Sequence, residues 1–251
     1  MAKQKGILKL EGTIGDVTFY KSPDGFLAKG KSSIPAARIA TDPAFQRTRE
    51  NGAEFGRAGK AGKLMRNSVR ALIQIASDRL LASRLTTKMV LVLQKDIRNP
   101  RGKRTVADGD TGLLQGFDFN INGKLGTTLY APFSTSIDRP GGVMKTNIPA
   151  FVPKNMVFAP VGATHFKIVT AGAEIDFANE KYVADIKETA ILPLDENPTA
   201  VIDLANAVTA NSTFPLFLAL GVDFYQQVNG QQYPLKNGAF NPLSIVKVNH
   251  L

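Results

Sequence analysis

The sequence predicts an α+β protein in which an N-terminal β-hairpin and a basic pair of helices are followed by an antiparallel β-sandwich. Three observations support this. The hydrophobic period is close to 2 before residue 31, helical between about residues 42 and 98, and close to 2 again beyond residue 111. Clusters of Gly, Pro and Asn separate the later apolar runs. The charge is also divided, with 22 Lys and Arg against 10 Asp and Glu in residues 1–110, but 9 against 11 in residues 111–251.

The first expected unit is a small β-structure over residues 7–31. The segment from Ile7 to Leu10 alternates apolar and polar side chains, and the segment from Val17 to Tyr20 is β-branched and aromatic. Between Ser22 and Gly25, Pro and Gly occupy positions that a type I turn favours. We therefore expect a hairpin here.

Two amphipathic helices are expected between about residues 42 and 98. Thr41-Asp42-Pro43 is a helix-start signal, and apolar side chains then recur on one side of a helical wheel to about Ala76. A second apolar series begins near Ser77 and ends before Asn99. The short connection predicts an antiparallel pair or one long bent helix. Residues 99–112, rich in Gly and charge, are interpreted as an interdomain linker or exposed loop, so the first domain covers residues 1–110.

Residues 111–251 are expected to form a second, sandwich-like domain of roughly seven to nine short strands. Alternating segments include His165 to Val169 and Phe217 to Tyr225. Asn229-Gly230 favours a two-residue hairpin turn.

Glycines inside the first predicted helix form the candidate assembly interface. Each interior helical Gly costs about 0.5–1 kcal/mol relative to Ala, so several together indicate a close neighbour. Gly52, Gly56 and Gly59 fall within about 60° of arc, and Gly62 follows one turn later. We expect a face that another subunit approaches closely. The alternative is that these glycines admit a large side chain from the core of the same chain.

A basic set on the same helices forms a candidate site for anionic contact: Arg49, Lys60, Lys63, Arg66 and Arg70. The cations are spread around the wheel, and no aromatic residue is interleaved after Phe55, so nucleic-acid contact would be to phosphates and sensitive to salt. The alternative is a solvated helix pair. The segment does not match a phosphate-binding loop, because no Ser or Thr follows the final Lys and no strand immediately precedes it.

We do not expect an enzyme. The chain has no Cys and only two histidines, His165 and His250, which disfavours cysteine or histidine nucleophiles and multi-histidine metal sites. An enzyme with paired carboxylates that acts on an anionic polymer is a third, weaker alternative. We expect no cofactor, no metal and no small-molecule substrate.

The acidic candidates have simpler explanations. Asp108 and Asp110 lie in a Gly-rich loop that lacks the pattern of an EF-hand. Glu174 and Asp176 share one face of a predicted strand, and we interpret them as solvated residues of a strand edge.

The sequence also suggests where the protein resides. No run of about 18 apolar residues is present, so no membrane partner is expected. The N-terminus lacks the apolar segment of a signal peptide, which favours the cytoplasm or a particle released without a signal peptide.

Several motifs in about the first 70 residues resemble a set of uncharacterised proteins from Bacteroidetes. They are the segment from Gly12 to Tyr20 with Gly25, the segment from Thr48 to Phe55, and the positions Ala58 and Leu64-Met-Arg66. The resemblance implies an N-terminal Gly-x-Ile-Gly strand and hairpin, an Arg-containing helix pair and a C-terminal β-domain. It carries no established activity and no residue roles.

Two functions are consistent with these features. The first is a structural, self-assembling protein, a homo-oligomeric subunit of a filament, tube, shell or phage-like particle, held by the Gly-rich helix and by complementary charge. The second is a nonspecific nucleic-acid-binding module that uses the basic helical region.

Overall fold

The computed structural model describes residues 1–30, 34–76 and 78–250, and it confirms the α+β class with antiparallel strand pairing. The chain divides into two compact units, Met1–Glu50 and Asn51–Leu251. This division lies well before the boundary that the charge distribution suggested at residue 110. The reason is found in the core of the second unit.

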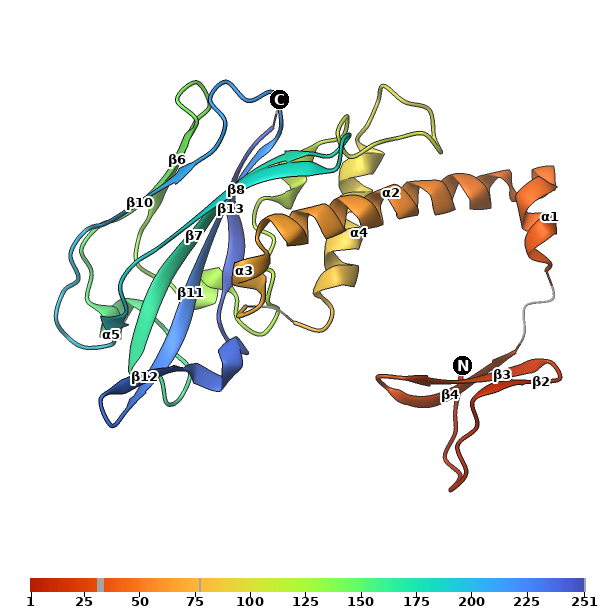
Figure 1. Ribbon diagram of the computed structural model, residues 1–251, viewed down its shortest axis with the longest axis horizontal. Helices are drawn as coiled ribbons and strands as arrows, with labels where there is room; N and C mark the ends of the chain where they lie inside the picture. The colour runs from red at the N-terminus through yellow and green to blue at the C-terminus, as the bar shows by residue number, and fades with distance from the viewer. Residues whose placement is uncertain (31–33, 77, 251) are drawn as a thin grey trace. The chain divides into compact units, whose positions relative to one another are not determined.

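The first unit contains a four-stranded antiparallel sheet (Figure 1), with strand order β1-β4-β3-β2. Its strands are β1 (Ala2–Lys3), β2 (Gly12–Ile14), β3 (Val17–Ser22) and β4 (Gly25–Gly30). The predicted tight turn is confirmed, because Ser22 and Gly25 are directly paired at the end of the β3–β4 ladder. Gly25 has a φ of 108°, which a residue with a side chain rarely adopts. Residue 31, the end of the expected hairpin, lies outside the described residues.

The segment from Ile7 to Leu10 is a loop between β1 and β2, not the strand that its alternation suggests. The side chain of Gln4 accepts a hydrogen bond from the Leu10 backbone N–H at 2.9 Å and donates to the Leu10 carbonyl oxygen at 3.3 Å. These are the backbone groups that a strand ladder would have used.

The helical region starts earlier than predicted and is interrupted. Its elements are α1 (Ala36–Thr41), the 3₁₀ turn η1 (Pro43–Phe45), α2 (Gln46–Ser68), α3 (Arg70–Ile73) and α4 (Leu81–Gln94). The start signal is confirmed as a cap of η1, since the Asp42 side chain accepts a hydrogen bond from the Ala44 N–H at 2.9 Å. The helix expected to reach Ala76 ends at Ser68, because Val69 leaves the helical region with φ −117° and ψ 26°. Ser77, the expected start of the second helix, lies outside the described residues.

The second unit contains two antiparallel sheets. The larger has the order β12-β11-β7-β8, with β13 also paired to β11 and β9 to β7, and the smaller has the order β10-β6-β5. The strands are β5 (Ser134–Asp138), β6 (Val143–Ile148), β7 (His165–Asp176), β8 (Lys181–Glu188), β9 (Leu192–Pro193), β10 (Ile202–Ala207), β11 (Leu216–Val228), β12 (Gln231–Pro234) and β13 (Leu243–Asn249). The short helical elements are η2 (Thr111–Leu114), η3 (Leu125–Thr127), α5 (Pro153–Met156) and η4 (Leu235–Gly238). The predicted Asn-Gly turn is confirmed between β11 and β12, with positive φ at Asn229 and Gly230.

The large sheet of this unit is the middle of three layers. Alternate residues of β7 and β11, such as Ala171 and Phe217, share a core with residues of α2 and α4. The residues between them, such as Ile168 and Leu220, point to the other face of the sheet and share a second core with Ile148 of the small sheet. Figure 1 shows α2 and α4 on one side of the large sheet and β6 and β10 on the other.

This arrangement explains the position of the boundary between units. The buried residues Met65 of α2 and Leu85 and Met89 of α4 belong to the same hydrophobic cluster as the large sheet. The basic helices therefore form one folded body with the β-rich part instead of a separate domain. In Figure 1 α2 and α4 cross, so they form neither an antiparallel pair nor one bent helix.

A candidate interaction surface on helix α2

Helix α2 buries one side and exposes the other. Ala58, Ala61 and Met65 recur at helical spacing and are buried in the core. The glycines of the candidate interface fall mostly on the opposite side. Their surroundings therefore test whether they serve packing within this chain.

Three of the four glycines have open space in front of them. A Cβ atom added at Gly52, Gly56 or Gly59 would meet no atom within 4 Å, after the neighbouring residues and the backbone of the helix itself are left out. Gly62 differs, because it is buried and an added Cβ would lie 3.6 Å from Thr86 Oγ1 and 3.7 Å from Leu85 Cγ. Packing against α4 thus accounts for Gly62, and no neighbour among the described residues accounts for the other three.

An aromatic side chain stands among these glycines. Phe55 is 62% exposed, and helical spacing places it three residues after Gly52, directly before Gly56 and four residues before Gly59. We call Gly52, Phe55, Gly56 and Gly59 the glycine face. A large exposed ring beside bare backbone gives this face both a protruding group and a shallow surface.

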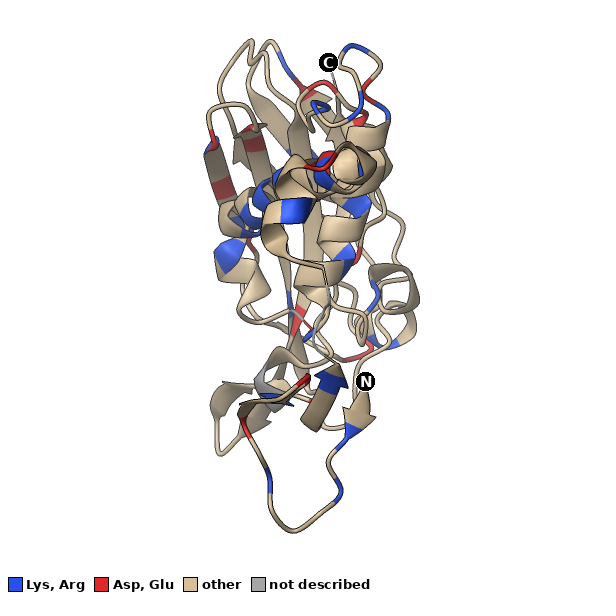
Figure 2. Cartoon of the chain, turned by 90° about the vertical axis from the view of Figure 1, so that its right-hand side faces the viewer, with Lys and Arg blue, Asp and Glu red and all other residues tan. Residues whose placement is uncertain are grey.

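The five candidate cations do not form one cluster. Arg49 belongs to the first unit, where its Nη1 donates to the carbonyl oxygens of Ile39 at 2.8 Å and Asp42 at 2.9 Å. Lys60 and Lys63 are exposed on α2, and Arg70 is exposed on α3. Figure 2 shows Lys and Arg positions along this helical region.

One of these cations has an acidic neighbour, and another is half-buried. Lys60 Nζ lies 3.6 Å from Glu180 Oε1, in an ion pair whose side chains are both largely exposed, so it contributes little to stability. Arg66 is half-buried, and its Nη1 is buried without a hydrogen-bond partner among the described residues. Lys60 and Lys63 remain as the most accessible cations of α2 beside the glycine face.

The loop between α4 and η2 is held against α2 and is not a linker between domains. Glu54 is buried, and its Oε1 accepts a hydrogen bond from the Gly102 N–H at 2.7 Å. Arg57 donates to the carbonyl oxygens of Arg104, at 2.6 Å, and of Gly102. Sequence reasoning missed this role, because the contacts join positions more than forty residues apart.

Asp96 organises the interior of the same loop. Its carboxylate accepts hydrogen bonds from the side chain of Asn99 at 2.9 Å and from the backbone N–H groups of Arg98, Asn99 and Thr105. Burial opposes the charge, but these donors together lower the pKa of Asp96 to about 2. The loop is therefore fixed by a carboxylate that stays ionised.

The acidic residues considered as cation ligands are occupied by their own loop. Asp108 accepts hydrogen bonds from Thr105 Oγ1 at 2.8 Å and Asn99 Nδ2 at 3.1 Å, and Asp110 accepts one from the Gly112 N–H. Among the described residues, no group of three or more His, Cys, Asp and Glu side chains is arranged to hold a metal ion.

Glu174 and Asp176 are buried, so the interpretation as solvated residues of a strand edge is wrong. Glu174 Oε2 accepts a hydrogen bond from the Thr209 N–H at 3.1 Å. Asp176 closes the turn after β7 by accepting from the backbone N–H groups of Ala178 and Asn179. Both carboxylates satisfy backbone donors that alternation along a strand cannot reveal.

The two histidines have separate partners. His165 Nδ1 lies 2.9 Å from Thr164 Oγ1, and His250 Nδ1 lies 2.9 Å from Thr111 Oγ1. Neither contact includes a carboxylate that would orient a catalytic imidazole.

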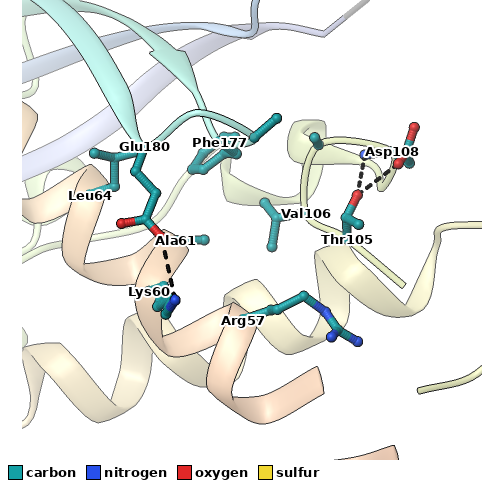
Figure 3. A pocket seen from close by; sticks show the side chains of 11 residues that line it. Arg57, Lys60, Ala61, Leu64, Thr105, Val106, Asp108, Phe177 and Glu180 are labelled. Atoms are coloured by element: carbon teal, nitrogen blue, oxygen red, sulfur yellow. Dashed lines mark hydrogen bonds and ion pairs between the residues drawn. The ribbon is translucent and has the colours of Figure 1, made fainter. Parts of the chain in front are cut away.

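A small cavity of about 300 Å³ borders α2 beside Lys60 (Figure 3). Ala61, Leu64 and Phe177 contribute apolar walls, and the ion pair between Lys60 and Glu180 crosses its rim. The cavity lies between α2, the loop at residues 105–108 and the turn after β7. It adds a concave surface next to the exposed cations of α2.

A scan against models of protein families, a search of curated proteins and a search of solved structures each found no match to this chain. The resemblance to Bacteroidetes proteins thus stays a prediction. Within the described residues, no helix is both long and apolar enough to cross a membrane.

Proposed function

We propose that this protein is a structural, self-assembling subunit, and that the glycine face of α2 is a contact between copies. The observation that carries the proposal is the open space in front of Gly52, Gly56 and Gly59. Alanine would fit at each position and would favour the helix by about 0.5–1 kcal/mol. Three such positions on one exposed face are best explained by a neighbour that needs bare backbone.

Phe55 supports the same proposal. An aromatic ring that is 62% exposed on a folded unit leaves apolar surface in water, and burial of such rings is a common source of binding energy between proteins. A partner helix or sheet that approaches the glycines covers the ring as well. One contact thus accounts for both unusual features of the face.

The division of charge favours contact between unlike parts of two copies. Residues 1–110 carry a net charge of +12, whereas residues 111–251 carry −2. Contact between the basic region of one copy and the β-rich region of the next reduces repulsion between like charges. Unlike surfaces that meet in this way generate rings or filaments.

Nonspecific binding of nucleic acid is the second candidate function, favoured by the exposure of Lys60, Lys63 and Arg70. Contacts of this kind would be made to phosphates and would weaken steeply as salt increases. The neutral glycine face would then have no assigned role.

Sedimentation velocity and negative-stain electron microscopy of the purified full chain distinguish the two functions. Self-assembly predicts ordered particles much larger than one chain, and their formation does not need nucleic acid. Nucleic-acid binding predicts a small protein that retards DNA or RNA in gels at low salt only. A single-chain particle at every concentration would contradict self-assembly.

A further inference from the structure

Helix α4 has one buried face and a second face that lies beside a later loop. Leu85, Met89 and Val92 are buried in the core shared with the large sheet. The second face consists of residues at helical spacing that stay at least partly accessible, namely Arg84, Thr87, Lys88 and Leu91. Between this face and residues 116–124 lies a cavity of about 440 Å³. We call it the α4 pocket, and its volume falls in the range of small-molecule sites.

Arg84 joins the two walls of the α4 pocket. Its Nη1 donates to the Asp118 carbonyl oxygen at 2.8 Å, and its Nη2 donates to the Phe119 carbonyl oxygen at 3.1 Å. The same Nη2 is ion-paired with Asp78, whose Oδ2 also accepts a hydrogen bond from the Ile121 N–H at 2.9 Å. These contacts fix the loop against α4. A ligand would therefore lose little free energy in ordering the site.

Two further cations line the pocket. Lys88 comes from α4 and Lys124 from the loop, and both are exposed. Neither lysine is in an ion pair with another described residue. Asp118 supplies the one carboxyl group among the lining residues, all of which the structure describes. Burial raises the pKa of Asp118, and its Oδ1 accepts a hydrogen bond from the Leu125 N–H at 3.4 Å. The pocket thus presents two accessible ammonium groups beside one half-buried carboxyl group.

The remaining side chains of the pocket are largely apolar. Leu91 is 44% exposed and Ile121 is 47% exposed. Phe117 completes this surface, and the Phe119 ring, with its centre 5.4 Å away, packs edge to face against it. A ligand with an apolar body would remove this surface from water, whereas an inorganic ion would not. The lining therefore favours an anion that carries an apolar group.

We propose that the α4 pocket binds a small organic acid. Its anionic group pairs with Lys88 and Lys124. Its apolar body packs on Leu91, Phe117 and Ile121. Such binding lies outside the proposed self-assembly and does not depend on it. Ammonium groups act as point charges, so they pair with a carboxylate as well as with a phosphate. The chemistry that these ligands share is a negative charge attached to an apolar body.

Equilibrium dialysis of the purified full chain tests the class of ligand, because it counts bound molecules whether or not the chain assembles. The probes are 1-naphthoate, 1-naphthyl phosphate and octanoate, which differ in the anionic group and in the apolar body. At least one should bind at one molecule per chain with a Kd of about 1 mM or below. Absence of saturation below about 10 mM for all three probes would overturn the inference.

Matched compounds test the two halves of the recognition. 1-Naphthamide and octanamide keep the apolar body without the charge, and acetate keeps the charge without the body. Each should bind at least about tenfold more weakly than the acid that binds best. Equal binding of an acid and its amide would show that the lysines do not recognise the ligand, and it would also overturn the inference.

Variants locate the site. Lys88→Gln combined with Lys124→Gln should weaken binding of the acid by about tenfold, because two charge contacts are lost. Lys145→Gln combined with Lys181→Gln, at exposed positions of β6 and β8, removes the same charge and should leave binding unchanged. Equal affinities of these two double variants would overturn the assignment to the α4 pocket.

Asp118→Asn gives a test of opposite sign. The amide keeps an acceptor oxygen for the Leu125 N–H and removes a negative charge beside the bound anion, so binding should become about threefold tighter. Leu91→Asp, at an exposed position, should abolish binding because it places a carboxylate on the apolar wall. Urea unfolding checks that each variant still folds cooperatively. Weaker binding by Asp118→Asn, or normal binding by Leu91→Asp, would contradict the proposed position of the acid.

The outcomes separate this inference from the proposed function. A chain that binds the acid but never assembles would contradict self-assembly and leave the α4 pocket as a ligand site. A chain that assembles but binds none of the probes would overturn the ligand site and leave self-assembly intact.

Discussion

Glu54 of α2 accepts a hydrogen bond from the backbone N–H of Gly102 at 2.7 Å, and this contact joins the helix to the loop that follows α4. The Nε of Arg104 lies 3.8 Å from the same carboxylate oxygen. The carboxylate is buried, so the loss of its acceptors would leave a backbone donor and a cation without a partner.

Glu54→Ala should therefore destabilise the protein by about 1–3 kcal/mol in urea unfolding. Glu54→Gln keeps an acceptor oxygen for the Gly102 N–H, so its free energy of unfolding should fall by less than that of Glu54→Ala. Glu180→Gln is a matched control, because it removes only the exposed ion pair with Lys60 and should change stability by less than about 1 kcal/mol. If Glu54→Ala and Glu180→Gln lose the same free energy of unfolding, the contact between Glu54 and the loop has no special role in stability.

The glycine face predicts opposite effects on stability and assembly. Gly56→Ala should stabilise the folded chain by about 0.5–1 kcal/mol, because nothing stands where its Cβ would lie. Gly56→Leu with Gly59→Leu should abolish assembly while the chain still unfolds cooperatively. Ala53→Leu, an exposed position of the same helix outside the glycine face, should assemble normally. Normal assembly of the double leucine variant would eliminate the face as a contact.

Asp96 predicts a loss of stability in acid. Its pKa is about 2 in the folded protein and about 3.8 in an unfolded chain, so its contribution is complete above pH 3.8 and disappears as the pH falls toward 2. The difference corresponds to about 2 kcal/mol. Asp96→Asn should remove this part of the pH dependence in urea unfolding. If the free energy of unfolding depends on pH between 4 and 2 in the same way in the variant, this pH dependence does not come from Asp96.

Asp223 predicts a dependence of opposite sign. The side chain on β11 is 2% exposed, Asn241 donates to its Oδ1 at 3.2 Å, and within the described residues its Oδ2 has no hydrogen-bond partner. Burial raises the pKa of Asp223 to about 6, and the charge of Lys167 offsets this only in part. A raised pKa favours the folded state when the group is protonated, so stability should fall as the pH rises from 3.8 to 6.

Asp223→Asn should remove the fall in the free energy of unfolding between pH 3.8 and 6. Above pH 6 the variant should be more stable than the unmodified chain by up to about 3 kcal/mol. The measurement is urea unfolding from pH 4 to 8. Asp203→Asn, at an exposed position of β10, serves as the control and should leave the slope unchanged. A variant less stable than the unmodified chain at pH 8 would show that the carboxylate has a favourable partner.

Lys60→Glu combined with Lys63→Glu tests the role of the exposed cations. If these residues contact phosphates, gel retardation of DNA at low salt should weaken, and the salt dependence of binding should become shallower. Lys145→Glu combined with Lys181→Glu, at exposed positions of β6 and β8, changes the net charge by the same four units and is the control for a general charge effect. Unchanged retardation and unchanged assembly would indicate that the two lysines are only solvated.

Local signals in the sequence predicted much of the fold. The turn at Ser22 to Gly25, the cap at Asp42 and the turn at Asn229-Gly230 depend on neighbouring residues, and the structure contains all three. The position of the unit boundary was missed, because a charge difference says nothing about which surfaces share a core. Met65 and Phe217 are 152 positions apart and lie in one cluster.

The candidate site was only partly accessible to sequence reasoning. Helical spacing placed Gly52, Gly56 and Gly59 on one side of the helix, and the structure leaves open space in front of all three, but the spacing could not distinguish Gly62, whose neighbours come from α4. The burial of Glu54 was also invisible, because its donor is a backbone group of a distant loop. Alternating patterns identify the face of a residue, whereas its partners depend on segments brought together by folding.

The late position of β11 and β13 along the chain has a consequence for biosynthesis. These strands supply Phe217, Leu243 and Ile245 to the core that α2 and α4 share. During translation, both helices therefore leave the ribosome well before the strands that cover their apolar sides are synthesised. Contacts between such distant segments also slow folding. The apolar sides of the nascent helices would thus be candidates for chaperone capture until residues 216–249 emerge from the exit tunnel.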